Sequence, residues 1–287
     1  MILLTGLDSS IGLRVARRLL KSGHDFTALA NDTHKDLDLK SKRVTLIKGN
    51  LSKTDSIKKA MDGIESAFLM APLTENQFKL EKNFIDAAKK AGVKHVVKYS
   101  AIGADTDSPS LILRSHGESE KYLKKSGLRY TIIRPNIFMQ DFVEFYGQDI
   151  RKKKLLKLPL KNAKCGYIDI RDTARLIKKV LTSNGQKNKT YTLTGPESLN
   201  GKEIAELISD TMGKKINYVD IKPKEFKQDL MSLGFKESLA EAYADLYKLI
   251  REGMFDLLTD DIYKITDSQP RTFEEFLDDN VKFFLRK

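Results

Sequence analysis

The chain opens with Met1-Ile-Leu-Leu-Thr-Gly6-Leu-Asp-Ser9-Ser-Ile-Gly12, and this stretch decides the fold. Its first apolar residues predict a buried strand, and the apolar spacing of Ile11, Val15 and Leu19 predicts a helix that begins inside the same stretch. A strand that turns sharply into a helix leaves the first N–H groups of the helix unpaired and aimed at one point. Such a turn suits an anion, and we expect the diphosphate of a dinucleotide there.

The turn departs from the usual glycine-rich pattern in its middle. That pattern has a third small residue so that the backbone can approach the pyrophosphate, whereas this chain has Ser9 next to the acidic Asp8. Taken alone, the turn fits an ordinary strand-to-helix connection as well as a dinucleotide site. The expected cofactor-binding residues of the turn are Gly6, Asp8, Ser9, Ser10, Ile11 and Gly12.

Length and composition limit the class of protein. A chain of 287 residues is long for one core, so we expect a large domain over residues 1–150 and a smaller C-terminal lobe over 151–287. No run of about 18 apolar residues predicts a membrane span, and no basic leader precedes the first strand. A single cysteine, Cys165, allows no internal disulfide and no thiolate metal site, so we expect a cytoplasmic protein without a metal.

The net charge of +12 comes from 51 basic and 39 acidic residues that are mostly interspersed. One stretch, Arg151 to Lys161, has several lysines and no acid. It fits either a solvated helix end and loop or a rim that attracts anions to a substrate cleft. Because no aromatic platform or DNA-binding motif accompanies the charge, we expect no nucleic-acid partner.

Beyond the first strand and helix, apolar runs alternate with segments of helical periodicity. This alternation predicts parallel strands with right-handed crossovers, hence a Rossmann-type doubly wound α/β sheet with a smaller C-terminal α/β lobe. Expected strands are 26–30, 44–47, 66–70, 95–100, 130–134, 190–193 and 217–221. Expected helices are 53–61, 77–91, 116–126, 172–181, 202–212 and 238–251.

Parallel sheets bind ligands at the carboxyl ends of their strands, so the residues that follow each strand are candidates for cofactor contact. Asn31 follows the second strand, where an acid or an arginine usually selects between NAD and NADP; Asn31 is neither, and Lys35 is a nearby cation. Turn chemistry explains several of these residues equally well. The remaining strand-end candidates are Asn50, Leu51, Ala71, Pro72, Ser100, Ala101 and Pro135.

Several short motifs together resemble the NmrA-like branch of the atypical short-chain dehydrogenases/reductases, in order from Met1 to about Phe276. This resemblance implies a domain that binds NAD(H) or NADP(H) and a lobe that closes the substrate cleft. It also implies hydride transfer to flat acceptors, as in quinone oxidoreductases and triphenylmethane reductases. The motifs are Thr5-Gly6 to Gly12, Gly49-Asn50-Leu51, Phe68-Leu-Met-Ala-Pro72, Tyr99-Ser-Ala-Ile-Gly103, His116-Gly-Glu-Ser-Glu120, Ile133-Arg-Pro-Asn136, Phe138-Met-Gln140 and Tyr191-Thr-Leu-Thr-Gly-Pro196.

The catalytic pair of short-chain enzymes is absent. Ser100 stands at the end of the fifth strand as in those enzymes, but His116 and Glu120 occupy the register of the Tyr-x-x-x-Lys pair. Since a Glu cannot stabilise a tyrosinate, reactions that must deprotonate an unactivated hydroxyl are disfavoured. His116, with an ordinary pKa near 6.5 and Glu120 one turn away, is a candidate proton donor, and a purely structural role stays open.

We therefore expect an NAD(P)H-dependent reductase of a quinone-like planar acceptor, with catalytic candidates His116 and Ser100. Residues after the sixth strand are candidate substrate contacts, namely Asn136, Phe138 and Phe142, although core packing at helical spacing explains such apolar residues too. Two alternatives remain. One is a dinucleotide-binding redox sensor without catalysis, and the other is an epimerase-like protein that has lost its catalytic pair or its cofactor.

Overall fold

The computed structural model describes residues 1–31, 39 and 41–286, and the chain divides into two compact units. Unit 1 comprises Met1–Asp107, Arg114–Arg134 and Thr173–Tyr191, and unit 2 comprises Ser108–Leu113, Pro135–Asp172 and Thr192–Lys287. This division differs from the boundary expected at residue 150. The chain enters unit 2 as its sixth strand ends, and a later helix and strand return to unit 1.

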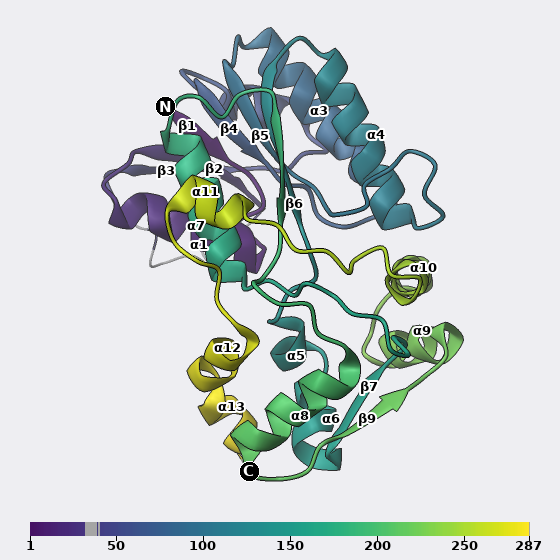
Figure 1. Ribbon diagram of the computed structural model, residues 1–287. Helices are drawn as coiled ribbons and strands as arrows, with labels where there is room; N and C mark the ends of the chain where they lie inside the picture. Colours follow the sequence, from purple (N-terminus) through teal and green to yellow (C-terminus); the bar gives the residue numbers. More distant parts are fainter. Residues whose placement is uncertain (32–38, 40, 287) are drawn as a thin grey trace. The chain divides into compact units, whose positions relative to one another are not determined.

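The predicted doubly wound α/β fold is confirmed. Seven strands form one sheet in the order β3-β2-β1-β4-β5-β6-β8, and the central pairs β1–β2, β1–β4, β4–β5 and β5–β6 are parallel. The order reverses beside β1, so the turn after β1 opens at the reversal point (Figure 1). The strands are β1 (Ile2–Leu4), β2 (Phe26–Ala30), β3 (Val44–Lys48), β4 (Ser66–Leu69), β5 (His95–Tyr99), β6 (Arg129–Pro135) and β8 (Lys189–Leu193).

Helices cover both faces of this sheet because its central strands are apolar on both sides. Leu3, Ala67 and Val96 lie on one face and pack with residues of α2, α3 and α4 in one buried cluster. On the other face lie α1 and α7, whose ribbons run close together in Figure 1. The helices are α1 (Ser10–Lys21), α2 (Thr54–Ala60), α3 (Gln77–Lys90), α4 (Leu111–Lys125) and α7 (Ile170–Thr182).

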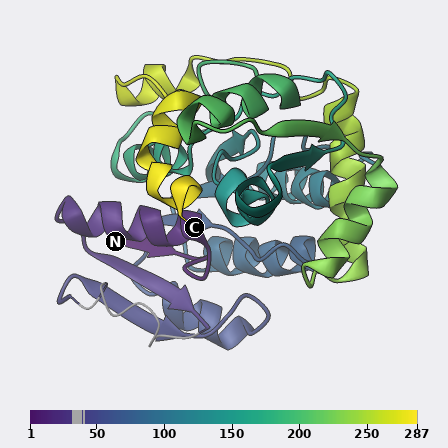
Figure 2. The same cartoon turned by 90° about the horizontal axis from the view of Figure 1, so that it is seen from below.

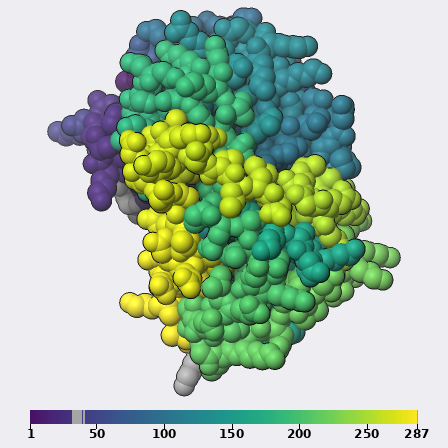
Figure 3. Space-filling model, viewed as in Figure 1, coloured from purple at the N-terminus to yellow at the C-terminus, as the bar shows by residue number. Residues whose placement is uncertain are grey.

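Unit 2 is built mainly from helices around a two-stranded parallel sheet of β7 (Leu155–Leu158) and β9 (Asn217–Asp220). Helices α9 and α10 pack side by side (Figure 2), and α12 and α13 reach the surface shown in Figure 3. The helices are α5 (Asp141–Glu144), α6 (Gly147–Lys153), α8 (Gly201–Met212), α9 (Pro223–Ser232), α10 (Glu237–Arg251), α11 (Asp261–Thr266), α12 (Phe273–Asp279) and α13 (Val281–Leu285).

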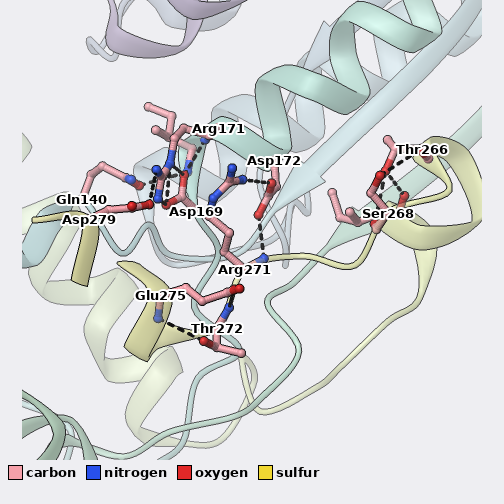
Figure 4. A network of polar contacts seen from close by, with 12 residues as sticks. Gln140, Asp169, Arg171, Asp172, Thr266, Ser268, Arg271, Thr272, Glu275 and Asp279 are labelled. Carbon is pink, nitrogen blue, oxygen red and sulfur yellow. Dashed lines mark hydrogen bonds and ion pairs between the residues drawn. The ribbon is translucent and has the colours of Figure 1, made fainter. Parts of the chain in front are cut away.

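A polar network within unit 2 joins the C-terminal segment to Asp169 and to Arg171 and Asp172 in the first turn of α7 (Figure 4). The buried Asp169 accepts both Nε and Nη2 of Arg171, and Nη1 of Arg171 lies 2.5 Å from Asp279. The buried Asp172 accepts the backbone N–H and the guanidinium of Arg271. Together, these contacts fix where α12 begins.

The basic stretch Arg151 to Lys161 contains the expected helix end, which is the end of α6, and then the strand β7 where a loop was expected. Acids of α9, distant in sequence, supply the counter-charges of Lys157. Lys157 lies within 3.6 Å of Glu225 and Asp229, and the guanidinium of Arg151 lies over the Phe283 ring. Leu156 and Leu158 are both buried, and this alternation is typical of a strand. The surrounding lysines made the pattern hard to recognise in the sequence.

Candidate functional site

The turn after β1 is held by a threonine that ties two strands together. The Thr5 hydroxyl donates to the carbonyl oxygens of Phe68 and Met70 and accepts the N–H of Met70 at 2.9 Å. These contacts fix the ends of β1 and β4 side by side. The turn and the segment Ala71-Pro72 therefore begin at the same edge of the sheet.

Two glycines make the turn as tight as it is. Gly6 has φ +76°, a conformation that L side chains rarely adopt, and a Cβ there would lie 3.0 Å from the Met70 side chain. A Cβ on Gly12 would lie 2.1 Å from the carbonyl oxygen of Gly6. The first turn of α1 consequently packs directly against the backbone of the turn, which brings the helix N-terminus to its mouth.

Ser9 does not block this mouth. It is the N-cap of α1, and its hydroxyl folds back into the turn, donating to Gly6 O at 2.6 Å and accepting Gly12 N–H at 3.0 Å. The next two N–H groups, those of Ser10 and Ile11, have no hydrogen-bond acceptor anywhere in the described part of the chain. These two groups are free to bind an anion, and the positive end of the helix dipole favours one.

Asp8 and Asn31 form a polar pair at the ends of β1 and β2. The Asn31 side-chain amide donates to the Asp8 carboxylate at 3.0 Å, and both residues are exposed. This is the place where a dinucleotide-binding fold reads the adenosine ribose. Lys35, the nearby cation, lies outside the described residues.

At the end of β5, Ser100 belongs to a buried polar cluster. Its hydroxyl donates to Glu120 at 2.6 Å, and Arg134 grips the two oxygens of Glu120 at 2.8 and 2.6 Å. Burial raises the pKa of Glu120, but the hydrogen bonds from Arg134 and Ser100 outweigh it and the pKa is lowered. Arg134 thus neutralises the Glu120 carboxylate, which stands where the Tyr-x-x-x-Lys pair would have its lysine.

His116 lies in a second buried cluster. Its Nδ1 is 3.2 Å from Gln77 Nε2 and 3.3 Å from Lys98 Nζ, and Lys98 pairs with Glu81 at 2.9 Å with both side chains fully buried. Burial and the charge of Lys98 hold the pKa of His116 well below its usual range. His116 is therefore neutral at pH 7, so it cannot supply a proton as an imidazolium, and its hydrogen-bond partners are Gln77 and Lys98 rather than Glu120.

The other strand-end candidates differ in how accessible they are. Asn50 accepts the N–H and hydroxyl of Ser52 through its side-chain oxygen, as turn chemistry predicts, and Leu51 is buried in the core. Ala71 is 8% exposed and Pro135 is buried, whereas Pro72 is exposed and Ala101 is half-buried. Among these candidates, Pro72, Ala101 and the half-buried Asn50 present a side chain that a ligand can reach.

Two of the three substrate candidates have structural roles instead. The buried Asn136 donates to Phe255 O and accepts Ile137 N–H and Cys165 Sγ–H, so its amide oxygen and nitrogen are both engaged. Phe142, 1% exposed, makes edge contacts with the rings of Tyr167 and Phe273 in the core of unit 2. Hydrogen bonds therefore engage Asn136 and core packing buries Phe142, so these contacts leave neither side chain free for a substrate within unit 2. Phe138 remains half-buried.

Sequence reasoning missed the charged residues that surround the candidate site. Lys98 and Arg134 stand inside otherwise apolar strands, and such a residue needs a buried partner. A charged residue inside an apolar strand therefore indicates, from the sequence alone, that a partner of opposite charge lies nearby. The sequence could not identify the partners, Glu81 and Glu120, because each lies on a helix and pairs with a residue of a separate strand.

The described residues lack both a membrane-spanning helix and a group of side chains suited to a metal ion. Among them, no helix is both long and apolar enough to cross a membrane. Nor do the described positions contain three or more His, Cys, Asp or Glu side chains grouped so as to hold a metal ion.

Comparisons with known proteins agree with this architecture. The chain is 36% identical over 276 residues to the NAD(P)H azoreductase of Xenophilus azovorans, covering 96% of each chain. Its fold matches the NADPH-dependent quinone oxidoreductase of Escherichia coli complexed with NADPH, at a TM-score of 0.90, 23% identity, and coverage of 97% of this chain and 99% of that one. The Citrobacter sp. triphenylmethane reductase complexed with NADP(H) gives a TM-score of 0.86 at 24% identity, covering 96% and 98%.

The model of the NmrA-like family matches residues 1–277, nearly the whole chain. Several of the motifs that suggested the resemblance lie at strand ends of the seven-stranded sheet, and the motif from His116 to Glu120 lies on α4. The chain belongs to the NmrA-like family.

Proposed function

We propose that this protein is an NAD(P)H-dependent reductase of a small planar acceptor such as a quinone or an azo compound. One observation carries the proposal: the N–H groups of Ser10 and Ile11, which have no acceptor among the described residues, begin a helix at a turn that Gly6 and Gly12 keep tight. The 36%-identical azoreductase supports it, because that relative is named for the same cofactor over the same length of chain. When bound, the reduced nicotinamide would supply a hydride.

We further propose roles for this chain's own residues. The N–H groups of Ser10 and Ile11 bind the diphosphate, and the exposed pair Asp8 and Asn31 contacts the adenosine ribose. Ser100, which donates to the Glu120 carboxylate, and the neutral His116 help to shape the nicotinamide end. A quinone suits such a site because it is already electron-poor, so its reduction does not need an activated tyrosine.

A substitution at Ser10 tests the diphosphate role without removing a side chain that the fold needs. Ser10 is the first helical residue, and Ser9 before it has φ −100° and ψ 152°, which a following proline tolerates. We expect Ser10→Pro to weaken NAD(P)H binding about 10- to 100-fold, because it removes one N–H donor to a charged oxygen worth about 1.5–3 kcal/mol.

Ser10→Ala is the matched control, because it removes the hydroxyl and keeps the N–H. Its affinity for NAD(P)H, measured by calorimetry, should match that of the unmodified protein. Equal binding by both variants, with unchanged thermal melting, would mean that the dinucleotide does not bind at this turn.

Turnover is tested by following the loss of NADH or NADPH absorbance with a panel of quinones and azo dyes. Oxidation of the cofactor that depends on the acceptor supports the reductase. Tight binding of NAD(P)H with no acceptor reduced would instead establish the alternative, a dinucleotide-binding sensor.

A further inference from the structure

Unit 2 contains a pocket that the proposed function does not use. It lies where α5 and the residues after it face α9, α10 and the loop between these two helices. Aromatic side chains from four separate segments make most of its wall, and Asp141 adds a carboxylate. The aromatic residues are Phe145, Tyr146, Phe226, Phe235, Tyr243 and Tyr247.

The rings form a connected wall. The centroid of Phe235 is 5.8 Å from that of Phe145 and 5.8 Å from that of Tyr243, both in edge contacts. On the other side, the hydroxyl oxygens of Tyr146 and Tyr247 lie 2.8 Å apart and share a hydrogen bond. Because these rings brace one another, the pocket is a preformed feature of unit 2.

Asp141 has no counter-charge in this pocket. Among the described residues, no N–H or O–H group donates to its carboxylate, and the nearest charge is that of Glu144, which has the same sign. Burial, followed by the charge of Glu144, raises the pKa of Asp141 to about 7. An acid kept without a partner among aromatic rings costs stability, which is typical of a residue retained for a ligand.

Size and charge together select the ligand. The free space is about 20 Å³, enough for one body the size of a water molecule. A primary ammonium group has that size, and it is attracted both by a carboxylate and by the faces of tyrosine and phenylalanine rings. A trimethylammonium group is too large, and a carboxylate or phosphate would be repelled by Asp141 and Glu144.

We propose that this pocket binds the primary ammonium group of a small organic amine, with Asp141 as its counter-ion and the rings of Tyr146, Tyr243 and Phe235 as its cation–π partners. The inference goes beyond the proposed reductase activity and does not depend on it. Binding can be measured without cofactor or turnover, so failure of one proposal leaves the other intact.

The test uses n-butylammonium as the probe, titrated into the full-length protein by calorimetry. We expect one site with a Kd on the order of 1 mM, and binding about 10-fold weaker or more for tetramethylammonium and for neutral 1-butanol. Asp141→Asn should weaken n-butylammonium binding about 10-fold or more, since it removes the counter-ion. Tyr243→Leu should weaken it about 3-fold or more, since it removes one ring.

Glu144→Gln is the matched control. It removes one negative charge from the same helix, but Glu144 does not line the pocket, so we expect affinity within about 2-fold of the unmodified protein. The titratable groups that interact with Asp141 are Glu144, Tyr146, Cys165, Tyr167, Tyr243 and Tyr247, and none of them is basic. Ammonium binding should therefore ionise Asp141 and release protons at pH 7, seen as a dependence of the heat on the buffer.

Two results would overturn the proposal. One is equal affinity of the unmodified protein and a folded Asp141→Asn variant, which would mean non-specific attraction. The other is no binding of n-butylammonium at about 50-fold above the expected Kd, which would mean that the space holds only water.

Discussion

Single residues decide what the two candidate pockets can accept. In unit 1, the carboxylate of Asp8 is exposed at the turn and is engaged by the amide of Asn31. In unit 2, the carboxylate of Asp141 is half-buried among aromatic rings. The charge of Asp8 should affect which cofactor binds. The charge of Asp141 should affect the free energy of unfolding.

We expect the carboxylate of Asp8 to disfavour a cofactor with a 2′-phosphate. A unit charge about 4 Å away contributes roughly 1 kcal/mol in water, which corresponds to about 5-fold in affinity. We expect Asp8→Asn to increase the affinity for NADPH relative to NADH by about this factor at low salt. Fluorescence titration with both cofactors measures the ratio, and an unchanged ratio would place the 2′ position away from Asp8.

Asp141 destabilises the fold at neutral pH. Its pKa rises from 3.8 to about 7 on folding, so the protonated form is favoured in the fold and its stabilisation is lost as the pH rises through 7. The uncharged variant Asp141→Asn should therefore be more stable than the unmodified protein at pH 8, by about 1–2 kcal/mol after allowance for partial exposure. Urea unfolding at pH 8 and pH 4 checks this, since the gain should vanish at pH 4.

At the scale of elements, β5 and the helices beside it hold two buried charge clusters. Lys98 on β5 pairs with Glu81 on α3, and Glu120 on α4 pairs with Arg134 on β6. These pairs hold α3 and α4 in register against β5 and β6. Ser100 follows β5, and His116 lies on α4 itself. A buried ion pair contributes little net stability, but each partner depends on the other.

The Lys98–Glu81 pair gives a clear prediction. Lys98→Met alone should lower the free energy of unfolding by about 3–5 kcal/mol, because it leaves Glu81 buried and unpaired. The double variant Lys98→Met with Glu81→Leu should recover most of this loss, since apolar residues of similar volume replace both charges. Chemical denaturation of the four proteins in the cycle measures the coupling, and additive losses would show that the two residues act independently.

At the scale of the whole molecule, two histidines make the fold sensitive to acid. His95, buried and bonded to Thr131 through Nε2 at 2.8 Å, has a pKa lowered to about 4, chiefly by burial. The pKa of His116 also lies well below its usual range, because of burial and the charge of Lys98. Both histidines bind protons more readily in the unfolded chain. Their contribution to the free energy of unfolding is therefore present above pH 6.5 and is lost as the pH falls.

We therefore expect the free energy of unfolding to fall between pH 6.5 and pH 4.5. His95 alone accounts for about 3 kcal/mol over its full range, at about 1.4 kcal/mol per pKa unit. His95→Gln keeps a donor for Thr131 and should make the slope shallower. Asp141 opposes this trend, so Asp141→Asn should make the slope steeper. Urea unfolding across this pH range is the measurement, and an unchanged slope in His95→Gln would contradict the assignment.

Most of unit 1 could be predicted from the sequence, and much of unit 2 could not. The strands of unit 1 are short apolar runs bounded by turn residues, and every expected one appears within a residue or two. In unit 2, β7 and the helices α5, α6 and α9 are short and polar on the outside. Their periodicity is weak over so few residues, so local sequence could not separate them from loops.

The candidate site divides in the same way. The turn from Gly6 to Gly12 was predictable, because glycine spacing and the apolar pattern of α1 are local properties. The roles of Phe142, Asn136 and Glu120 were not, because each depends on a partner distant in sequence. An aromatic residue on a helix shows the same sequence pattern whether it packs in a core or lines a pocket.

The sequence by itself determined the alternation of strands and helices, the turn at the carboxyl end of β1, and the family, since backbone preferences and hydrophobic period are written in neighbouring residues. Only the tertiary structure decided which charges are paired and which are free. Lys157 of β7 pairs with acids on α9, Lys98 pairs with Glu81, and Asp141 lies among aromatic rings. The physical reason is that electrostatic energy depends on distance and burial in space, and neither follows from position along the chain.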